Sequence, residues 1–269
     1  MSGFPQSWAV TGHELLADGV GGTVWRVRRA DAPDAIAKRL SPAAAAEAGP
    51  AQAWLSGQDG RGAVRLLAVA DGWQLLEDAG DRTLTAVLDA DGDDAAARIA
   101  AEALRALHGA DYAAEGLTIL FDRLGPLRQA GRREGGPFAD AAARAQRLSA
   151  RARRARPLHG DLHHDNLLHG PRGWLAIDPH GVFGDPTYDA ANLLYNPVER
   201  ADLRTNPARA RRMADILAPV VDDAAEAVLE WAVCHACLSA AWHLEDANRA
   251  EAVHSLGVAA AVRQVLEAG

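Results

Sequence analysis

The stretch that decides the fold is His159-Gly-Asp-Leu-His-His-Asp-Asn166, and Gly173-Trp-Leu-Ala-Ile-Asp-Pro-His-Gly181 follows it closely. Between these segments the pattern predicts a tight hairpin, with strands at Leu167–His169 and Trp174–Ile177. Gly170-Pro-Arg-Gly173 supplies the turn, because glycine and proline favour chain reversal. We expect the hairpin to bring the residues after its second strand back to those before its first.

Three side chains at the open end of this hairpin suit phosphoryl transfer. Asn166 and Asp178 would face one point with hard oxygen ligands, which suits Mg²⁺. Asp161 lies one short loop away, where a carboxylate can accept a proton from a substrate hydroxyl. Asp189 follows shortly after, and we expect it to hydrogen-bond loop backbone rather than perform chemistry.

The composition excludes several classes of protein. The 269 residues carry 28 basic and 36 acidic side chains, a net charge of -8, which disfavours a nucleic-acid binder. Hydrophobic residues make up 49%, but no apolar run approaches the roughly 20 residues of a membrane span. The N-terminus shows no secretory signal, and Cys234 and Cys237 fit an apolar helix in a reducing compartment. We expect a cytoplasmic protein with no membrane partner.

The chain divides into a β-rich part and a helical part, so we predict an α+β fold. The β-rich part is predicted to hold five strands and an alanine-rich helix that begins at Pro42, after Ser41 as N-cap, and is interrupted by Gly49-Pro50. The strands are Glu14–Ala17, Thr23–Arg29, Ala35–Arg39, Ala63–Ala70 and Gln74–Glu77, with Asp71-Gly72 as a hairpin turn. The predicted later helices are Asp94–His108, Phe138–Arg156, Pro207–Ala218 and Asp222–Leu244.

The set H-x-D-x4-N followed by D-x-x-G resembles the kinase-type catalytic core. The sequence resembles the aminoglycoside phosphotransferases in three segments, Leu158–Asn166, Trp174–Gly181 and Gly184–Asn192. Within that family it is most similar to the streptomycin 6-kinase and hydroxyurea-resistance kinase group. Gly60–Leu67, Leu75–Gly80 and Cys237–Trp242 extend the resemblance over almost the whole chain. Pro179-His180 replaces the aromatic residue of protein kinases, which argues against a protein kinase.

The resemblance implies a protein-kinase-like bilobal fold with ATP and Mg²⁺ as cofactors. Its lobes would be residues 1–76, a nucleotide-binding lobe, and residues 82–269, a helical lobe with the catalytic loop, joined by a hinge at 77–81. Asp161 would be the catalytic base, and Asn166 and Asp178 the Mg²⁺ ligands.

The resemblance also implies the nucleotide contacts. Lys38, the one lysine in the chain, would pair with the α- and β-phosphates. Glu47 would orient it, because the other acidic residues between Arg39 and Glu77, Asp59 and Asp71, lie in glycine-containing loops. The remaining contacts would be the backbone of Glu77–Ala79 on the adenine, His163 near the γ-phosphate, and Gly19, Gly21 and Gly22, which do not form a full G-x-G-x-x-G, over the phosphates.

The substrate implied by the resemblance is a small hydroxylated cation, with the 6-position of streptomycin as the leading prediction. An amino sugar or hydroxyurea-type compound is the alternative enzyme substrate, and a pseudokinase scaffold is the alternative without catalysis. Guanidinium groups call for carboxylates in the pocket. Candidates in the helical part are Asp185, Glu199, Asp202, Glu245 and Asp246, although each could equally lie on a solvated surface. We expect a monomer.

Overall fold

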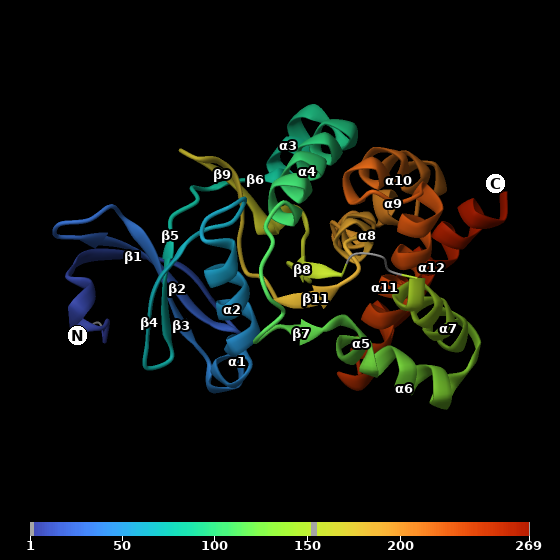
Figure 1. Cartoon of the computed structure of the whole chain (residues 1–269), viewed down its shortest axis with the longest axis horizontal. Helices are drawn as coiled ribbons and strands as arrows, with labels where there is room; N and C mark the ends of the chain where they lie inside the picture. The colour runs from blue at the N-terminus through green and yellow to red at the C-terminus, as the bar shows by residue number, and fades with distance from the viewer. Residues whose placement is uncertain (1–2, 152–154, 269) are drawn as a thin grey trace.

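A computed structural model describes residues 3–151 and 155–268 (Figure 1). The N-terminal lobe is a five-stranded antiparallel sheet in the order β1-β2-β3-β5-β4, with helices packed beside it. Its elements are the 3₁₀ helix η1 (Gln6–Trp8), β1 (Val10–Gly19), β2 (Gly22–Arg29), β3 (Ala35–Leu40), α1 (Pro42–Ala46), α2 (Ala48–Gln58), β4 (Leu66–Ala70) and β5 (Trp73–Glu77).

The strands of this lobe agree with the sequence prediction to within two residues, except at the starts of β1 and β4. Asp71 and Gly72 both have positive φ, 44° and 78°, as a tight hairpin turn requires. β1 is longer than predicted and begins at Val10. β4 is shorter, because Ala63 leaves the sheet and forms a bridge with Ala176 of the other lobe.

The alanine-rich helix is interrupted, but not at Gly49-Pro50 as predicted. Ser41 caps α1 by accepting a hydrogen bond from the N–H of Ala44. The chain breaks at Glu47, which ends α1 and precedes α2. Gly49 and Pro50 lie in the first turn of α2, where a proline needs no backbone N–H.

The C-terminal lobe is mainly helical, with short strands at its junction with the sheet (Figure 1). β6, β9 and β10 form one small sheet, and β7, β11 and β8 form another. The elements are β6 (Arg82–Thr83), α3 (Leu84–Asp91), α4 (Asp93–His108), β7 (Thr118–Ile119), α5 (Leu120–Arg123), α6 (Gly125–Glu134), α7 (Gly136–Arg151), β8 (Arg156–Leu158), η2 (His164–Asn166), β9 (Leu167–Gly170), β10 (Gly173–Ala176), β11 (Val182–Gly184), α8 (Thr187–Tyr195), α9 (Ala201–Arg204), α10 (Pro207–Val221), α11 (Ala225–Glu245) and α12 (Arg249–Ala268).

Two predicted helices have different ends in the structure. Arg156 begins β8 rather than ending the helix predicted from Phe138, and residues 152–154 lie outside the described part of the chain. The helix predicted from Asp222 begins at Ala225, because Asp222 adopts a left-handed conformation and caps α10. α4 and α10 begin within one residue of their predicted starts.

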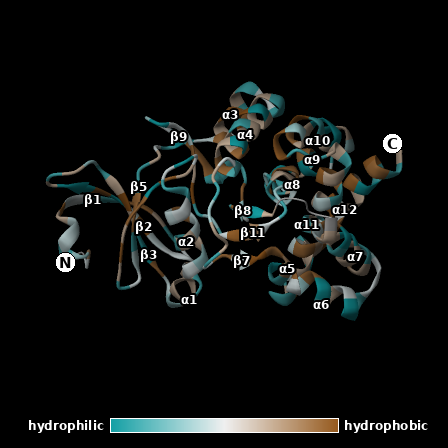
Figure 2. Ribbon diagram, in the orientation of Figure 1, coloured by the Kyte–Doolittle hydropathy of each residue, from teal (hydrophilic) through white to brown (hydrophobic). Residues whose placement is uncertain are grey.

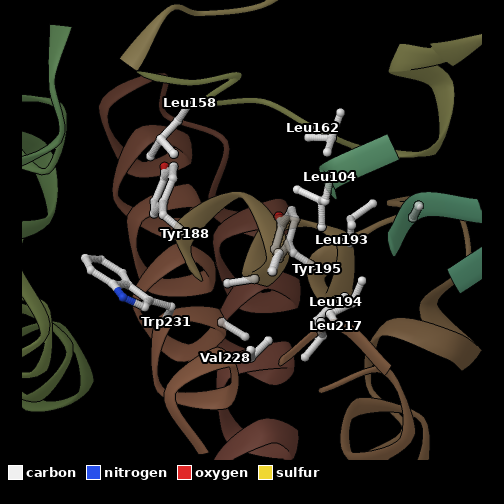
Figure 3. Close-up of a cluster of buried hydrophobic side chains, with 14 of the residues drawn as sticks. Leu104, Leu158, Leu162, Tyr188, Leu193, Leu194, Tyr195, Leu217, Val228 and Trp231 are labelled. Carbon is white, nitrogen blue, oxygen red and sulfur yellow. The ribbon is translucent and has the colours of Figure 1, made fainter. Parts of the chain in front are cut away.

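The main core runs through both lobes, and α8 and α11 contribute many of its buried residues. Tyr188 and Trp231 are fully buried there and meet edge to face with ring centroids 5.7 Å apart (Figure 3). Cys234 and Cys237 are buried on α11 facing α7, and burial raises the pKa of Cys237 to about 12. A thiol with so high a pKa is unreactive, as expected for packing cysteines.

A second, smaller core covers the outer face of the N-terminal sheet. Trp8 of η1 packs edge to face on Trp73 of β5, over Val27, Ala35 and other apolar residues of the strands. Along the helices on the outside of the C-terminal lobe, hydrophilic and hydrophobic residues alternate, as expected for helices with one buried face (Figure 2). Among the described residues no single helix has the length and apolar composition of a membrane span. Taken together, α10 and α11 have that length and composition, but the pair is bent by 109°.

Candidate active site

A cavity of about 400 Å³ lies where the N-terminal sheet faces the β9–β10 hairpin. Its walls come from both lobes: the N-terminal lobe contributes most of the apolar side chains together with Lys38, Glu47 and Gln74, and the catalytic loop and the residues after β10 contribute mainly polar ones. The lining includes Gly21, Lys38, Leu40, Glu47, Ala51, Val64, Leu76, Asp161, His163, Asn166, Asp178 and His180. The cavity thus collects most of the predicted catalytic, metal-binding and nucleotide-binding residues.

The hairpin forms as predicted and closes the site. Leu167 pairs with Ala176, and the N–H of Ile177 donates to the carbonyl of Asn166 at 3.0 Å. Asp178 follows at once with a φ of 51°, a left-handed conformation that turns the chain. The Asp178 carboxylate accepts from Lys38 Nζ at 2.7 Å, so this ion pair joins β3 to the hairpin across the cavity.

Asn166 holds the catalytic loop by its amide nitrogen. Its Nδ2 donates to the backbone carbonyl of Asp161 at 2.9 Å. The side chain is buried and lines the cavity. Because the nitrogen is used in this way, the amide oxygen is the atom left to bind a ligand. Asn166 and Asp178 together thus present hard oxygen atoms at one end of the cavity.

The carboxylate of Asp161 is surrounded by donors. Asn192 Nδ2 donates to Oδ1 at 3.3 Å, while Nε2 of His180 and of His163 lie 3.5 and 3.8 Å from Oδ2. Burial alone would raise the pKa of Asp161, but the hydrogen bond from His180 brings it well below its usual value. Asp161 therefore stays a carboxylate and can accept a hydrogen bond from a substrate hydroxyl.

The loop before Asp161 is fixed by a buried carboxylate, as the sequence predicted for Asp189. This side chain accepts from the N–H groups of His159 and Gly160 at 2.9 and 2.8 Å, and His108 Nε2 lies 3.1 Å away. His159 is also fully buried, and its Nδ1 accepts from the N–H of Asp161. Its Nε2 must then carry the proton, which it donates to Ile177 O at 2.8 Å. His159 supports the loop rather than reacting.

Arg123 of α5 is a site residue that the sequence analysis missed. It donates to the Gly160 carbonyl at 3.2 Å and to Nδ1 of His180 at 3.2 Å. Because an arginine only donates, His180 must present its Nε2–H towards Asp161. The guanidinium carbon also lies over the ring of Trp242 on α11, 5.0 Å from the ring centre. No local motif marks α5, so only the fold brings Arg123 here.

The glycine segment contributes one residue to the cavity. Val20 and Gly21 form the tip between β1 and β2, and Gly21 lines the cavity, whereas Gly19 and Gly22 pair with each other in the strands. Gly22 has a φ of 132°, and a Cβ there would collide with the carbonyl of Arg39. Close backbone packing therefore explains Gly22 without any phosphate contact.

Glu47, predicted to orient Lys38, and Glu77–Ala79, predicted to bind the adenine, are placed differently from the prediction. Glu47 lines the cavity from the junction of α1 and α2, but within the described chain Lys38 is paired with Asp178 and not with Glu47. Glu77 and Ala79 are absent from the described lining of the cavity. The N–H of Glu77 already donates to Arg65 O, and its carboxylate binds Arg172 at 2.6 Å. That ion pair ties the β9–β10 turn to the end of β5.

None of the five carboxylates suggested for the substrate lines the cavity within the described residues. Asp185 is buried, and its oxygens accept from Thr187 N and Trp231 Nε1, so it stabilises the start of α8. Asp202 is exposed and pairs with Arg200. Glu199, Glu245 and Asp246 are exposed. The charge count of the sequence could not tell these solvated or structural carboxylates from ligands.

Comparisons with known proteins agree with this geometry. The profile of the aminoglycoside/hydroxyurea antibiotic resistance kinases matches residues 7–247. A streptomycin 3''-kinase of Klebsiella pneumoniae is 37% identical over 78% of this chain and 81% of its own length. A streptomycin 6-kinase of Streptomyces glaucescens is 32% identical over 95% of this chain and 86% of its own.

The fold also matches solved structures. A thermostable mutant of an aminoglycoside phosphotransferase, solved with ADP and hygromycin B, superposes with a TM-score of 0.62 at 12% identity and covers 96% of each chain. At that identity the match concerns the fold alone. It confirms the predicted bilobal, kinase-like α+β architecture.

Proposed function

The chain belongs to the aminoglycoside/hydroxyurea antibiotic resistance kinases, enzymes that transfer phosphate to an alcohol group, and on that premise we propose that it phosphorylates streptomycin with ATP and Mg²⁺. One observation carries the proposal: Asp161, Asn166, Asp178 and Lys38 line a single cavity between the lobes. A phosphate on the drug adds about two negative charges, which would disrupt recognition by its target.

The residues present fit the two cofactors. Asn166 Oδ1 and the Asp178 carboxylate would hold Mg²⁺, which commonly uses one or two protein carboxylates together with phosphate oxygens. Bound there, the metal would neutralise charge on the phosphates. Lys38 reaches the same point, since its Nζ lies 2.7 Å from Asp178 Oδ1. Its ammonium would move to the phosphates once the carboxylate is shared with the metal.

The chain's own groups account for acceptor activation. Asp161 would accept a hydrogen bond from the substrate hydroxyl and orient its oxygen towards the γ-phosphate. A carboxylate with a low pKa is a weak base, so the proton would pass to it late, as the bond to phosphorus forms. His163 lies beside Asp161 and faces the cavity, where it would contact the transferring group.

The 6-hydroxyl of streptomycin is our leading acceptor position, and the 3''-hydroxyl is the second candidate. The streptomycin 6-kinase of S. glaucescens aligns with 95% of this chain, which supports the first. The K. pneumoniae relative, named for the 3'' position, has the higher identity, 37% against 32%, which supports the second. Both acceptors are hydroxyls of the same drug, so one assay separates them.

The test is an ATP-consumption screen over streptomycin, other aminoglycosides, hydroxyurea and amino sugars, followed by phosphorus NMR of the product. Turnover on streptomycin with phosphate at position 6 is expected. Phosphate at 3'' would keep the function and correct the position. Turnover on glucosamine with none on streptomycin would instead establish the metabolic kinase. ATP binding without transfer to any acceptor would establish the scaffold that lacks catalysis.

A further inference from the structure

A buried amide outside the H-x-D-x4-N and D-x-x-G motifs holds the carboxylate of Asp161 on the side away from the cavity. Asn192, in the last turn of α8, donates from Nδ2 to Asp161 Oδ1 at 3.3 Å. Its side chain is 1% exposed, so it reaches Asp161 from the protein interior and not from the cavity. We propose that Asn192 is a positioning residue that sets the rotamer of Asp161 for phosphate transfer, an inference that rests on the proposed function.

The direction of the Asn192 amide is fixed by its neighbour. Asn196 Nδ2 donates to Asn192 Oδ1 at 2.9 Å and to the Asn192 backbone carbonyl at 3.0 Å. Because Asn192 Oδ1 accepts from that side, its Nδ2 must point to the other side, where Asp161 lies. In the flipped orientation, Asn192 Oδ1 would face the Asp161 carboxylate and Asn192 Nδ2 would face Asn196 Nδ2, so neither hydrogen bond could form. Asn196 therefore decides which end of Asn192 faces the catalytic residue.

Asn196 is anchored in turn by a buried arginine that forms an ion pair. Arg209 of α10 donates to the backbone carbonyls of Asn196 and Leu194 at 3.0 and 3.2 Å. Arg209 is 1% exposed and pairs with Asp93 at 2.9 Å, at the start of α4. Asn192, Asn196 and Arg209 are buried, and each of them is hydrogen-bonded, which makes the arrangement rigid. These hydrogen bonds thus connect α4 and α10 to the catalytic loop through α8.

The contact leaves one oxygen of Asp161 to work on the substrate. Oδ1 is occupied by Asn192, whereas Oδ2 lies on the side of His180 and His163, which line the cavity. A neutral amide can fix the rotamer without adding the charge of a lysine or arginine. The backbone of Asp161 is held separately, by Asn166. Loss of Asn192 should therefore free the carboxylate to rotate while the loop stays in place.

The experiment compares phosphate transfer and nucleotide binding in Asn192→Ala and Asn196→Ala with wild type. We expect kcat to fall by about ten- to a hundredfold in both, with the KM for ATP and the nucleotide-induced rise in Tm unchanged. Ser239→Ala is the matched control. It removes a buried 2.7 Å hydrogen bond to Tyr195, in the same helix layer but without a link to Asp161, and should keep the wild-type kcat.

A double-mutant cycle separates positioning from general support of the fold. In an Asp161→Asn background, Asn192→Ala should lower the residual rate no further, because the two residues act as one unit. Equal losses in both backgrounds, or a wild-type kcat in Asn192→Ala and Asn196→Ala, would overturn the inference. A wild-type protein that transfers phosphate to no acceptor would overturn the proposed function as well, so the two failures are distinguishable.

Discussion

Removing the carboxylate of Asp189 should both destabilise the protein and slow phosphate transfer. Asp189 has no exposed surface and accepts from the N–H groups of His159 and Gly160. In Asp189→Ala both groups would remain buried without a partner, at about 1–3 kcal/mol each, or about 4 kcal/mol of unfolding free energy together. With 269 residues and about 2.1 cal/mol/K of unfolding entropy per residue, the Tm should fall by about 7 °C.

The assay is thermal unfolding followed by circular dichroism, with steady-state kinetics on the same samples. Asp189→Asn should lose about half as much free energy, because its amide oxygen can still accept one of the two bonds. kcat should fall in both variants, since the loop that they loosen carries Asp161. Asp202→Ala, at an exposed ion pair, is the control and should change neither Tm nor kcat. A wild-type Tm and kcat in Asp189→Ala would refute this reasoning.

Three further changes have defined outcomes. Gly181→Ala should abolish activity and lower expression of folded protein, because Gly181 has a φ of 67° and a Cβ would collide with Pro50 O; normal yield and turnover would contradict this. Lys38→Arg should raise the KM for ATP, because a planar fork does not replace the ammonium that lies 2.7 Å from Asp178; unchanged ATP kinetics would contradict it. Burial lowers the pKa of His235 from 6.5 to about 4, so between these values the unfolded chain binds the extra proton and stability falls as pH falls, by up to roughly 3 kcal/mol. His235→Phe should flatten that part of a urea-unfolding pH series, and an unchanged slope would contradict the argument.

The parts of the site that sequence could predict are those set by local spacing. Asn166 and Asp178 flank a hairpin with a short turn, so the chain between them fixes their meeting. Asp189 could be expected to cap the loop because aspartate often bonds nearby backbone, and the structure confirms it.

The parts that sequence missed depend on tertiary contacts. Arg123 is 57 residues from His180 in the chain, and nothing near it indicates that α5 ends against the catalytic loop. Asn192 ends the Gly184–Asn192 segment, and its contact with Asp161 depends on how α8 packs against the catalytic loop. Asp185, in contrast, was expected near the substrate because of its charge, but it is buried in the protein and accepts a hydrogen bond from Trp231.

The break in the alanine-rich helix shows the limit of local rules within one element. Glycine and proline next to each other predict an interruption at Gly49-Pro50. Proline is tolerated in the first turn, however, so the chain could break one turn earlier, at Glu47, and keep Pro50. The carbonyl of Pro50 then lies against Gly181, which places the start of α2 next to the loop after Asp178. That contact could not be inferred from either segment alone.

The most direct test of the account is the rate of phosphate transfer from ATP to streptomycin in wild type and Asp161→Asn, measured together with nucleotide binding. The account predicts a phosphorylated drug with wild type. It also predicts that Asp161→Asn loses most of kcat while binding ATP with unchanged affinity, because Asp161 acts on the acceptor and not on the nucleotide. Near-wild-type turnover by Asp161→Asn would contradict the central claim.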